Sequence, residues 1–484
     1  MGDIGMPTAT LGGSTETKSP SRNKLFLGTF IHSKTLTELE YLHNAAVAVN
    51  SLGTIVAVSP DTDLAKAQTT ILPQLSWLSE DTEIIVAKPG QFFFPGFIDT
   101  HLHASQYPNV GLFGNSTLLD WLNTYTFPLE ASLSSLPKAQ KVYSRVIRKT
   151  LSHGTTTAAY YATIDVPATN LLADLCLSSG QRALIGRVCM DQLGPSYYLD
   201  ESPAESLTKT KQCIEHVLTK DPKMELITPI ITPRFAPACS APLMKELGQL
   251  AKETDLPVQT HISENKNEIA LVASLFPDAG DSYAEVYDMF GLLTPKTILA
   301  HAVHLTEKEA DLVRERRSKV SHCPCSNSAI TSGAARVRWL LDKGIEVGLG
   351  TDMSGGYSPS VLEAARHAVL VSRHICMDEG RSEERDKLSV EEVLYLATRG
   401  GAKVVGMERK IGGLEVGMEW DVQLVGLHEV GDEEEEEDGG EEEGNVDVFG
   451  WESWEEKVAK WVYNGDDRNT KKVWVRGRLV HERR

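Results

Sequence analysis

Four histidines and one aspartate stand at the ends of segments that the sequence predicts to be strands. His101 and His103 are two residues apart, so on a strand both side chains point to the same face. His261, His301 and Asp352 end or follow later apolar segments. Imidazole and carboxylate ligands suit zinc or ferrous iron and leave one position open for water. The pattern predicts a metal site.

Glu264 stands three residues after His261, which would place a carboxyl group beside the ligands. A divalent ion lowers the pKa of water from 15.7 to roughly 7, and a nearby carboxyl group can carry protons to a leaving group. These residues predict a hydrolase in which Glu264 is the proton shuttle. The alternative for Glu264 is an ordinary solvated acid on a loop.

Eight apolar segments with the character of buried strands alternate with helical patterns in the middle of the chain. They are residues 93–100, 154–160, 183–189, 225–231, 257–261, 297–301, 319–322 and 346–351. Such alternation predicts a parallel sheet covered by helices, and eight units favour a (β/α)8 TIM barrel, an α/β fold. All strands of this barrel end at one mouth, which would bring the candidate ligands together. A doubly wound open sheet is the alternative, but no G-x-G-x-x-G follows the first strand.

Shorter β-like segments occupy both ends of the chain. They are residues 25–31, 45–49, 54–58, 421–427 and 472–480. Their placement predicts a small β-sandwich built from both termini, into which the barrel is inserted. We expect residues 24–93 with 408–484 to form this composite domain, residues 94–407 to form the catalytic barrel, and residues 1–23 to be a disordered tail.

Charge is concentrated in one segment of this 484-residue chain, whose formal net charge is −19. Eleven acidic side chains and no Lys or Arg lie between Glu429 and Glu443, which predicts a solvated, disordered loop at about residues 429–446. The rest of the chain carries no basic patch with interleaved aromatics, so we expect no nucleic-acid partner. We also expect no membrane span, because no run of 18 or more apolar residues occurs. The seven scattered cysteines favour a reducing, cytoplasmic location.

Several strings resemble those of the amidohydrolase superfamily. They are Pro95-Gly96-Phe97-Ile98-Asp99-Thr100-His101-Leu102-His103, the single residues His261 and His301, Gly350-Thr351-Asp352, and Gly412-Gly413-Leu414-Glu415-Val416-Gly417 with Asp421. In that superfamily the barrel is inserted into a sandwich made by both termini. Ile231-Thr232-Pro233 stands where a bridging lysine would follow the fourth strand, which resembles the single-metal deaminase branch. The resemblance implies one zinc ion, with iron as the alternative, bound by His101, His103, His261 and Asp352.

More specific strings are similar to those of purine-base deaminases within that branch. They are His103-Ala104-Ser105-Gln106-Tyr107, Asp120-Trp121-Leu122-Asn123-Thr124-Tyr125-Thr126-Phe127-Pro128, Thr232-Pro233-Arg234-Phe235, Gln259-Thr260-His261-Ile262-Ser263-Glu264-Asn265, Ser321-His322-Cys323-Pro324 and Asp352-Met353-Ser354-Gly355-Gly356-Tyr357-Ser358. The resemblance implies that a purine base is held by Gln106, Arg234, Phe235, His261, Glu264 and Asp352. Arginine offers a fixed donor fork, glutamine a donor and an acceptor, and an aromatic ring a packing face. A surface Arg, a loop Gln and a core Phe are the alternatives.

The implied reaction is hydrolytic deamination by a homodimer. Glu264 would protonate the ring nitrogen and the departing amine, Asp352 would accept the proton of water, and His301 would hydrogen-bond the attacking oxygen. Two alternatives are open: an enzyme that deaminates another heterocycle, such as a pterin, a triazine or an adenosine derivative, and a catalytically silent scaffold. The sequence departs from the family at Ala302-Val303-His304, where Gly-Cys is commoner. His304 is there either a polar neighbour of the pocket or a surface residue.

Overall fold

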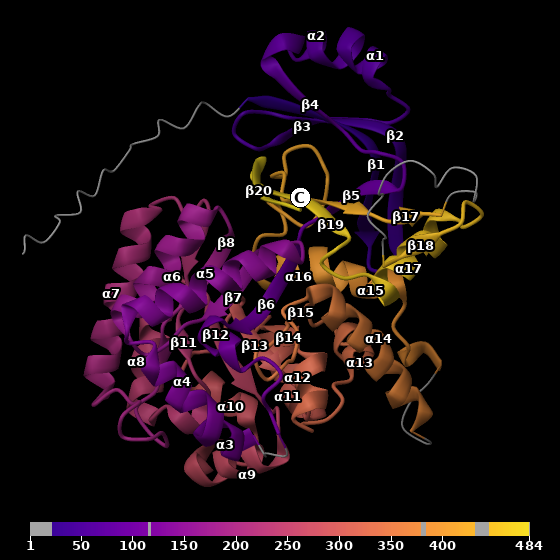
Figure 1. Ribbon diagram of the computed structural model, residues 1–484. Coiled ribbons are helices and arrows are strands. Elements are labelled where there is room, and N and C mark those ends of the chain that lie inside the picture. The colour runs from indigo at the N-terminus through magenta and orange to yellow at the C-terminus, as the bar shows by residue number, and fades with distance from the viewer. Residues whose placement is uncertain (1–21, 115–117, 379–383, 431–444, 484) are drawn as a thin grey trace, which may run out of the picture.

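The computed structural model is a mixed α/β protein and describes residues 22–114, 118–378, 384–430 and 445–483. The first described strands and the C-terminal strands lie together, indigo and yellow in Figure 1, beside a larger body of parallel strands and helices. Most of the predicted tail and of the predicted acidic loop lies outside the described residues, although the first strand already begins at Asn23.

Strands from both ends of the chain form one mixed sheet. Its members are β1 (Asn23–Thr35), β2 (Glu38–Val49), β3 (Ile55–Ser59), β4 (Thr82–Val86), β5 (Gln91–Pro95), β16 (Val422–Gly426), β19 (Thr470–Val475) and β20 (Arg478–Glu482). Their order is β20-β19-β16-β5-β1-β2-β3, with β4 also paired to β1. β16 runs antiparallel to β5, with Val422 opposite Pro95, so the C-terminal strands pair directly with the N-terminal ones. Aromatic side chains fill one face; the Phe26 and Trp420 rings stack 4.2 Å apart.

Parallel strands occupy all eight predicted positions in the middle of the chain. They are β6 (Phe97–His103), β7 (Thr155–Tyr161), β8 (Arg182–Gly186) with β9 (Val188–Cys189), β10 (Ile227–Pro229) with β11 (Thr232–Pro233), β12 (Val258–Ile262), β13 (Thr297–His301), β14 (Lys319–His322) and β15 (Val347–Leu349). One group has the order β10-β8-β7-β6 and another β12-β13-β14-β15, while β11 pairs with β9. A bridge between Ile231 and Val258 connects the fourth position to the fifth.

The prediction of a single strand over residues 93–100 is wrong. β5 ends at Pro95 and β6 begins at Phe97, so the chain leaves the terminal sheet and enters the parallel strands at Gly96. The Gly96 N–H donates to the Asp421 carbonyl oxygen at 2.9 Å. A Cβ atom at Gly96 would lie 2.2 Å from the Thr156 side chain, so no larger residue fits at this crossing without displacing its neighbour.

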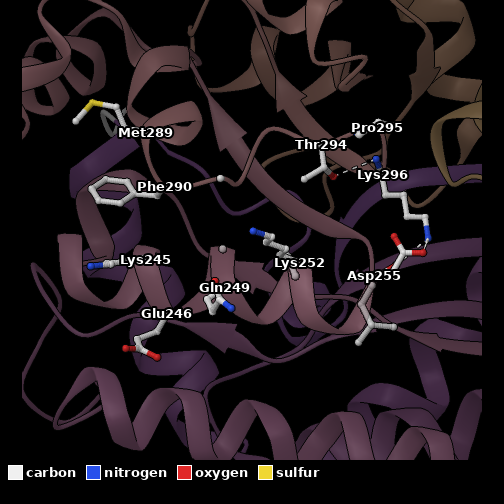
Figure 2. Close-up of a pocket in the computed structure, with 14 residues that line it drawn as sticks. Lys245, Glu246, Gln249, Lys252, Asp255, Met289, Phe290, Thr294, Pro295 and Lys296 are labelled. Carbon is white, nitrogen blue, oxygen red and sulfur yellow. Dashed lines mark hydrogen bonds and ion pairs between the residues drawn. The ribbon is translucent and has the colours of Figure 1, made fainter.

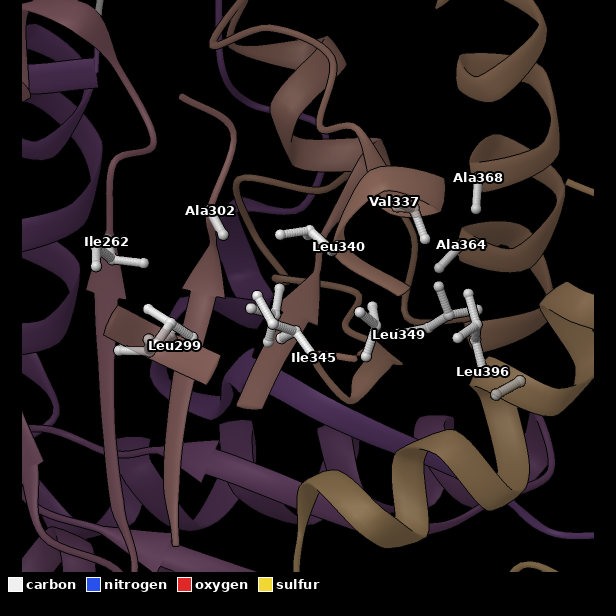
Figure 3. Packing of buried hydrophobic residues seen from close by; sticks show 14 of the residues in the cluster. Ile262, Leu299, Ala302, Val337, Leu340, Ile345, Leu349, Ala364, Ala368 and Leu396 are labelled. Carbon is white, nitrogen blue, oxygen red and sulfur yellow. The ribbon is translucent and has the colours of Figure 1, made fainter. Parts of the chain in front are cut away.

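Helices alternate with the parallel strands and cover them. The longer ones are α5 (Leu136–Ser152), α6 (Val166–Ser179), α7 (Pro203–Lys220), α8 (Ala241–Thr254), α9 (Lys266–Leu275), α10 (Tyr283–Met289), α11 (Glu307–Glu315), α13 (Val337–Asp342), α14 (Val361–Met377), α15 (Val390–Tyr395) and α17 (Trp454–Asn464). Figure 3 shows Leu299 and Leu349 of the strands in one buried cluster with Leu340 of α13 and Ala364 of α14. No helix among these described residues is long and apolar enough to cross a membrane.

A buried ion pair connects the terminal sheet to the parallel strands. Arg182 of β8 is fully buried, and its Nε donates to Asp421 Oδ2 at 2.9 Å. Asp421 Oδ1 also accepts from the Arg476 backbone N–H at 2.8 Å. Removing one partner of a buried pair leaves an uncompensated charge, so both regions depend on this contact.

Asp421→Asn should therefore lower the free energy of unfolding by about 2 kcal/mol, because the buried guanidinium of Arg182 loses one of its two carboxylate partners and keeps only Glu419. The matched control is Asp255→Asn, which removes the exposed pair with Lys296 and should cost less than about 1 kcal/mol. Urea unfolding followed by circular dichroism measures both. Equal losses in the two variants would contradict the structural role of the Arg182 pair.

Candidate active site

The ends of β6, β12, β13 and β15 bring the predicted metal ligands together. Asp352 Oδ1 lies 3.1 Å from His101 Nε2 and 3.4 Å from His103 Nε2. The Nε2 atoms of His103 and His261 are 3.3 Å apart. His301 Nε2 lies 3.8 Å from Asp352 Oδ2. Residues separated by some 250 positions in the sequence thus form one buried cluster, as the strand pattern predicts.

One group of four possible ligands differs from the predicted ligand set in one member. Ligand atoms of His101, His261, His301 and Asp352 all lie within 4.8 Å of one another. His301 stands in this group in place of His103, although His103 still touches His261 and Asp352. Five side chains therefore face one point, and four of them suffice for a tetrahedral ion.

Hydrogen bonds behind the cluster fix its geometry. The Nδ1–H of His261 donates to the Arg234 carbonyl oxygen at 2.6 Å, which leaves the lone pair of Nε2 available for a ligand bond. Asp99, which is fully buried, accepts from the Thr351 N–H at 3.0 Å and from the Thr351 hydroxyl at 2.6 Å. These bonds hold the residue before Asp352 against β6.

Backbone hydrogen bonds join β6, the first parallel strand, to the residues that follow β15, the last one, beside the histidine cluster. The Asp352 N–H donates to the His101 carbonyl oxygen, and the His103 N–H donates to the Met353 carbonyl oxygen, each at 2.9 Å. Asp352 and His301 also adopt left-handed backbone conformations, with φ of 45° and 75°. Such conformations are unfavourable for residues other than glycine and concentrate at functional sites.

The electrostatics of the cluster suit a cation. Burial lowers the pKa of His101, His103 and His261, so these imidazoles are neutral near pH 7. Burial alone would raise the pKa of Asp352, but the surrounding histidines hold it well below its usual range. The Nε2 atom of His301 is buried without a hydrogen-bond partner among the described residues. Neutral imidazoles beside an ionised carboxylate are the donor set of a divalent metal, so the residues fit a metal cofactor.

Glu264 lies at the edge of the cluster, as its spacing from His261 predicts. Its side chain is buried, and burial raises its pKa to about 7. Its Oε2 is 3.5 Å from His301 Nε2, and its Oε1 accepts from the Ser332 hydroxyl at 3.0 Å. A carboxyl group that titrates near neutrality can both release and accept a proton. The solvated loop acid is therefore excluded for Glu264.

A pocket with an empty volume of about 430 Å³ adjoins the cluster. Its walls include the polar residues His103, Gln106, Arg234, His261, Glu264, His301 and Asp352, with Leu118, Trp121, Leu122, Phe235 and Ile330 as apolar neighbours. The predicted base-binding residues thus share one cavity with His103, His261 and Asp352 of the predicted ligands. Polar groups that converge between apolar walls are typical of small-molecule sites.

Arg234 and Gln106 share a partner that sequence reasoning missed. Arg234 Nη1 donates to Glu130 Oε2 at 2.7 Å, and Gln106 Nε2 donates to Glu130 Oε1 at 2.8 Å. Arg234 is only 2% exposed, which excludes a surface salt bridge. The string that ends at Pro128 marks this segment, but nothing in the sequence distinguishes Glu130 from a solvated helical acid.

His304 is not part of the pocket wall. Its Nε2 lies 2.8 Å from the Ser332 carbonyl oxygen, and the side chain is half-buried. His304 thus contacts the backbone of Ser332, the residue whose hydroxyl donates to Glu264. The sequence offered a pocket neighbour or a surface residue, and the structure places it between the two.

A larger hollow lies elsewhere on the protein. It has an empty volume of about 1880 Å³ and lies between α8 and the segment that leads into β13 (Figure 2). Lys296 and Asp255 at its rim pair at 2.6 Å, and both side chains are exposed. None of the clustered histidines reaches it, so we place the active site in the smaller pocket.

Comparison with known proteins agrees with this geometry. The model of the amidohydrolase family matches residues 92–480. The chain belongs to the amidohydrolase family. This amidohydrolase is 48% identical over 460 residues to a probable guanine deaminase of Schizosaccharomyces pombe, covering 94% of this chain and 83% of that relative. It is 38% identical over 468 residues to the guanine deaminase of Homo sapiens, covering 95% and 97% of the two chains.

The fold also matches that of a solved guanine deaminase structure. The amidohydrolase superposes on guanine deaminase from C. acetobutylicum, which has guanine bound in its active site, with a TM-score of 0.81 and 34% identity. The match covers 95% of this chain and 100% of that chain. The family assignment from the sequence is confirmed.

We predict that His261→Ala lowers the metal content of the purified amidohydrolase at least about 10-fold. The substitution removes a ligand atom that lies 3.3 Å from His103 Nε2 and within 4.8 Å of the ligand atoms of His101, His301 and Asp352. The matched control is His153→Ala, which removes a half-buried histidine near Lys149 and Asp467, outside the pocket lining. Plasma mass spectrometry after dialysis against zinc measures both variants. Full metal occupancy in His261→Ala would contradict the ligand assignment.

Proposed function

We propose that this protein deaminates guanine hydrolytically, with xanthine and ammonia as products. As a member of the amidohydrolase family, the chain is a hydrolase of carbon–nitrogen bonds. The observation that carries the proposal is the single pocket in which a metal-suited cluster, Glu264 and the pair Gln106 and Arg234 meet. The relative that binds guanine in its active site supports the choice of base.

In this proposal His101, His103, His261 and Asp352 hold one zinc ion. Zinc, when bound, supplies Lewis acidity that makes water a competent nucleophile near neutral pH. His103 is preferred to His301 as a ligand because His301 is the side chain that lies beside Glu264. Its Nδ1 is 2.8 Å from Asn327 Oδ1, which fixes the ring with Nε2 toward the pocket. Iron fits the same donor set and is the alternative ion.

The remaining groups move protons and hold the developing charge. Glu264, with a pKa near 7, gives a proton to the ring nitrogen next to the amino-bearing carbon and later to the leaving amine. Asp352 stays ionised and can accept the proton of the attacking water. Burial alone would lower the pKa of His301, but Glu264 and Asp352 raise it, so this imidazole can donate to the attacking oxygen.

The base is held by residues on the opposite side of the pocket. Arg234 donates to the carbonyl oxygen of the purine, Gln106 binds the base edge, and Phe235 packs on the ring face. Phe235 is 8% exposed, its ring centroid lies 6.5 Å from that of His261, and it lines the pocket beside the cluster. These contacts would place the amino-bearing carbon toward Asp352 and Glu264.

The proposed architecture is a (β/α)8 barrel, residues 94–407, inserted into a β-sandwich domain, residues 24–93 with 408–484. The backbone bonds between β6 and residues 352–353 support closure of the barrel. All seven cysteines lie in the described part of the chain and none is in a disulfide, which supports a reducing, cytoplasmic location. The homodimer remains an expectation from the resemblance.

Glu264→Gln should lower kcat for ammonia release from guanine by about 10²- to 10⁴-fold, because the amide cannot carry a proton. Zinc content should stay unchanged, since Glu264 is not among the proposed ligands. A coupled ammonia assay and metal analysis test this together. Near-wild-type turnover in the zinc-loaded variant would refute the proton-shuttle role.

Arg234→Ala should abolish detectable turnover of guanine while the ion is retained, because it removes the donor to the carbonyl oxygen and leaves Glu130 buried without its cation.

Chelation of the wild-type enzyme should also abolish turnover, and added zinc should restore it. A panel of guanine, a pterin, a triazine and adenosine is the readout. Preference for any of the other three over guanine would overturn the proposed substrate.

A further inference from the structure

Glu130 lies behind the pocket as a buried carboxylate with several partners. It belongs to α4 (Phe127–Ser132), and its side chain is fully buried. Besides the bonds from Arg234 Nη1 and Gln106 Nε2, its Oε1 accepts from Arg234 Nη2 at 3.3 Å. Glu130 also contributes to the raised pKa of the buried Tyr198 hydroxyl. Both oxygens of Glu130 are therefore occupied by the side chains that form the floor of the base pocket.

The first consequence concerns the amide of Gln106. An amide nitrogen and oxygen are told apart by their partners, and only the nitrogen can donate to a carboxylate. Because Nε2 donates to Glu130, Oε1 is the end left to accept, and among the described residues it accepts from the Ser354 hydroxyl at 3.4 Å. Gln106 is only 1% exposed, so water cannot compensate a reversed amide. The residue is held as an acceptor toward the ligand.

The second consequence concerns the charge of Arg234. Burial alone lowers the pKa of Arg234, but Glu130 outweighs that effect and raises it, so the guanidinium stays charged. Its Cζ lies 5.0 Å above the Phe127 ring, one turn before Glu130 on the same helix. The charges of Arg234 and Glu130 cancel within the pair, which suits a neutral base better than an anionic ligand. Arg234 is held as a donor toward the ligand.

We propose that Glu130 is a positioning residue that sets the donor and acceptor pattern read by the pocket. This inference rests on the proposed function. With Arg234 as donor and Gln106 as acceptor, the complementary base edge carries a carbonyl oxygen beside a ring N–H, as guanine does. 2,6-Diaminopurine has the same 2-amino group but an amino group in place of the carbonyl and no proton on the adjacent ring nitrogen. Glu130 thus selects 6-oxo over 6-amino purines.

The test uses Glu130→Gln in the full-length, zinc-loaded enzyme, with ammonia release from guanine and from 2,6-diaminopurine. We expect the wild type to prefer guanine by at least about 100-fold in kcat/KM. In Glu130→Gln we expect KM for guanine to rise at least about 10-fold, kcat to fall less, and the preference to drop at least about 10-fold. Glu130→Asp keeps the charge with a shorter reach, should fall between the two, and serves if the glutamine variant does not fold.

A matched control separates positioning from stability. Glu392→Gln removes another buried glutamate with an arginine partner, Arg338, far from the pocket lining, and should leave the base preference unchanged. Equal losses of kcat on both bases in Glu130→Gln, with the preference intact, would overturn the inference and leave deamination standing. Wild-type enzyme without preference between the bases would do the same. Failure of the wild type to deaminate any aminopurine would overturn both proposals.

Discussion

The hydrogen bonds that join the end of β6 to residues 351–353 are the constraint on which the site depends. The Asp352 N–H bonds to the His101 carbonyl oxygen, and the Asp99 carboxylate holds Thr351. Without them His101 and Asp352, which are far apart in the sequence, would not share one point in space. Their cost is visible locally: Asp352 adopts a left-handed backbone conformation, and burial raises the pKa of Asp99 to about 7.

The fully buried arginines in the described part of the chain each pair with a carboxylate. Arg182 pairs with Asp421 where the terminal sheet meets the parallel strands, and Arg234 pairs with Glu130 in the pocket. A single buried charge would cost several kcal/mol, so each pair fixes the relative position of two segments as firmly as hydrophobic packing does. Buried arginine–carboxylate pairs thus have two roles. The Arg182 pair aligns the two regions of the fold, and the Arg234 pair presents a hydrogen-bond donor to a ligand.

The sequence predicted the positions of the parallel strands and the side chains that meet at their ends. Both predictions need only the pattern of apolar residues and the residue types, which a single sequence contains. It failed at Gly96, where an apolar run crosses from one sheet to another without a break in hydrophobicity. It also could not find Glu130, because burial of an acid on a helix depends on partners that arrive from distant segments. The choice between His103 and His301 lies in distances of a few ångströms, which no spacing rule resolves.

Arg234 contacts both halves of the site with different atoms. Its carbonyl oxygen accepts from the imidazole of His261, and its guanidinium faces the pocket with Glu130 behind it. A shift of this residue on ligand binding would therefore move the ring of His261, and a shift of His261 on ion binding would move the guanidinium. Thermodynamic linkage makes such coupling reciprocal: whatever factor an occupied pocket adds to the affinity for the ion, the ion must add to the affinity for the occupant.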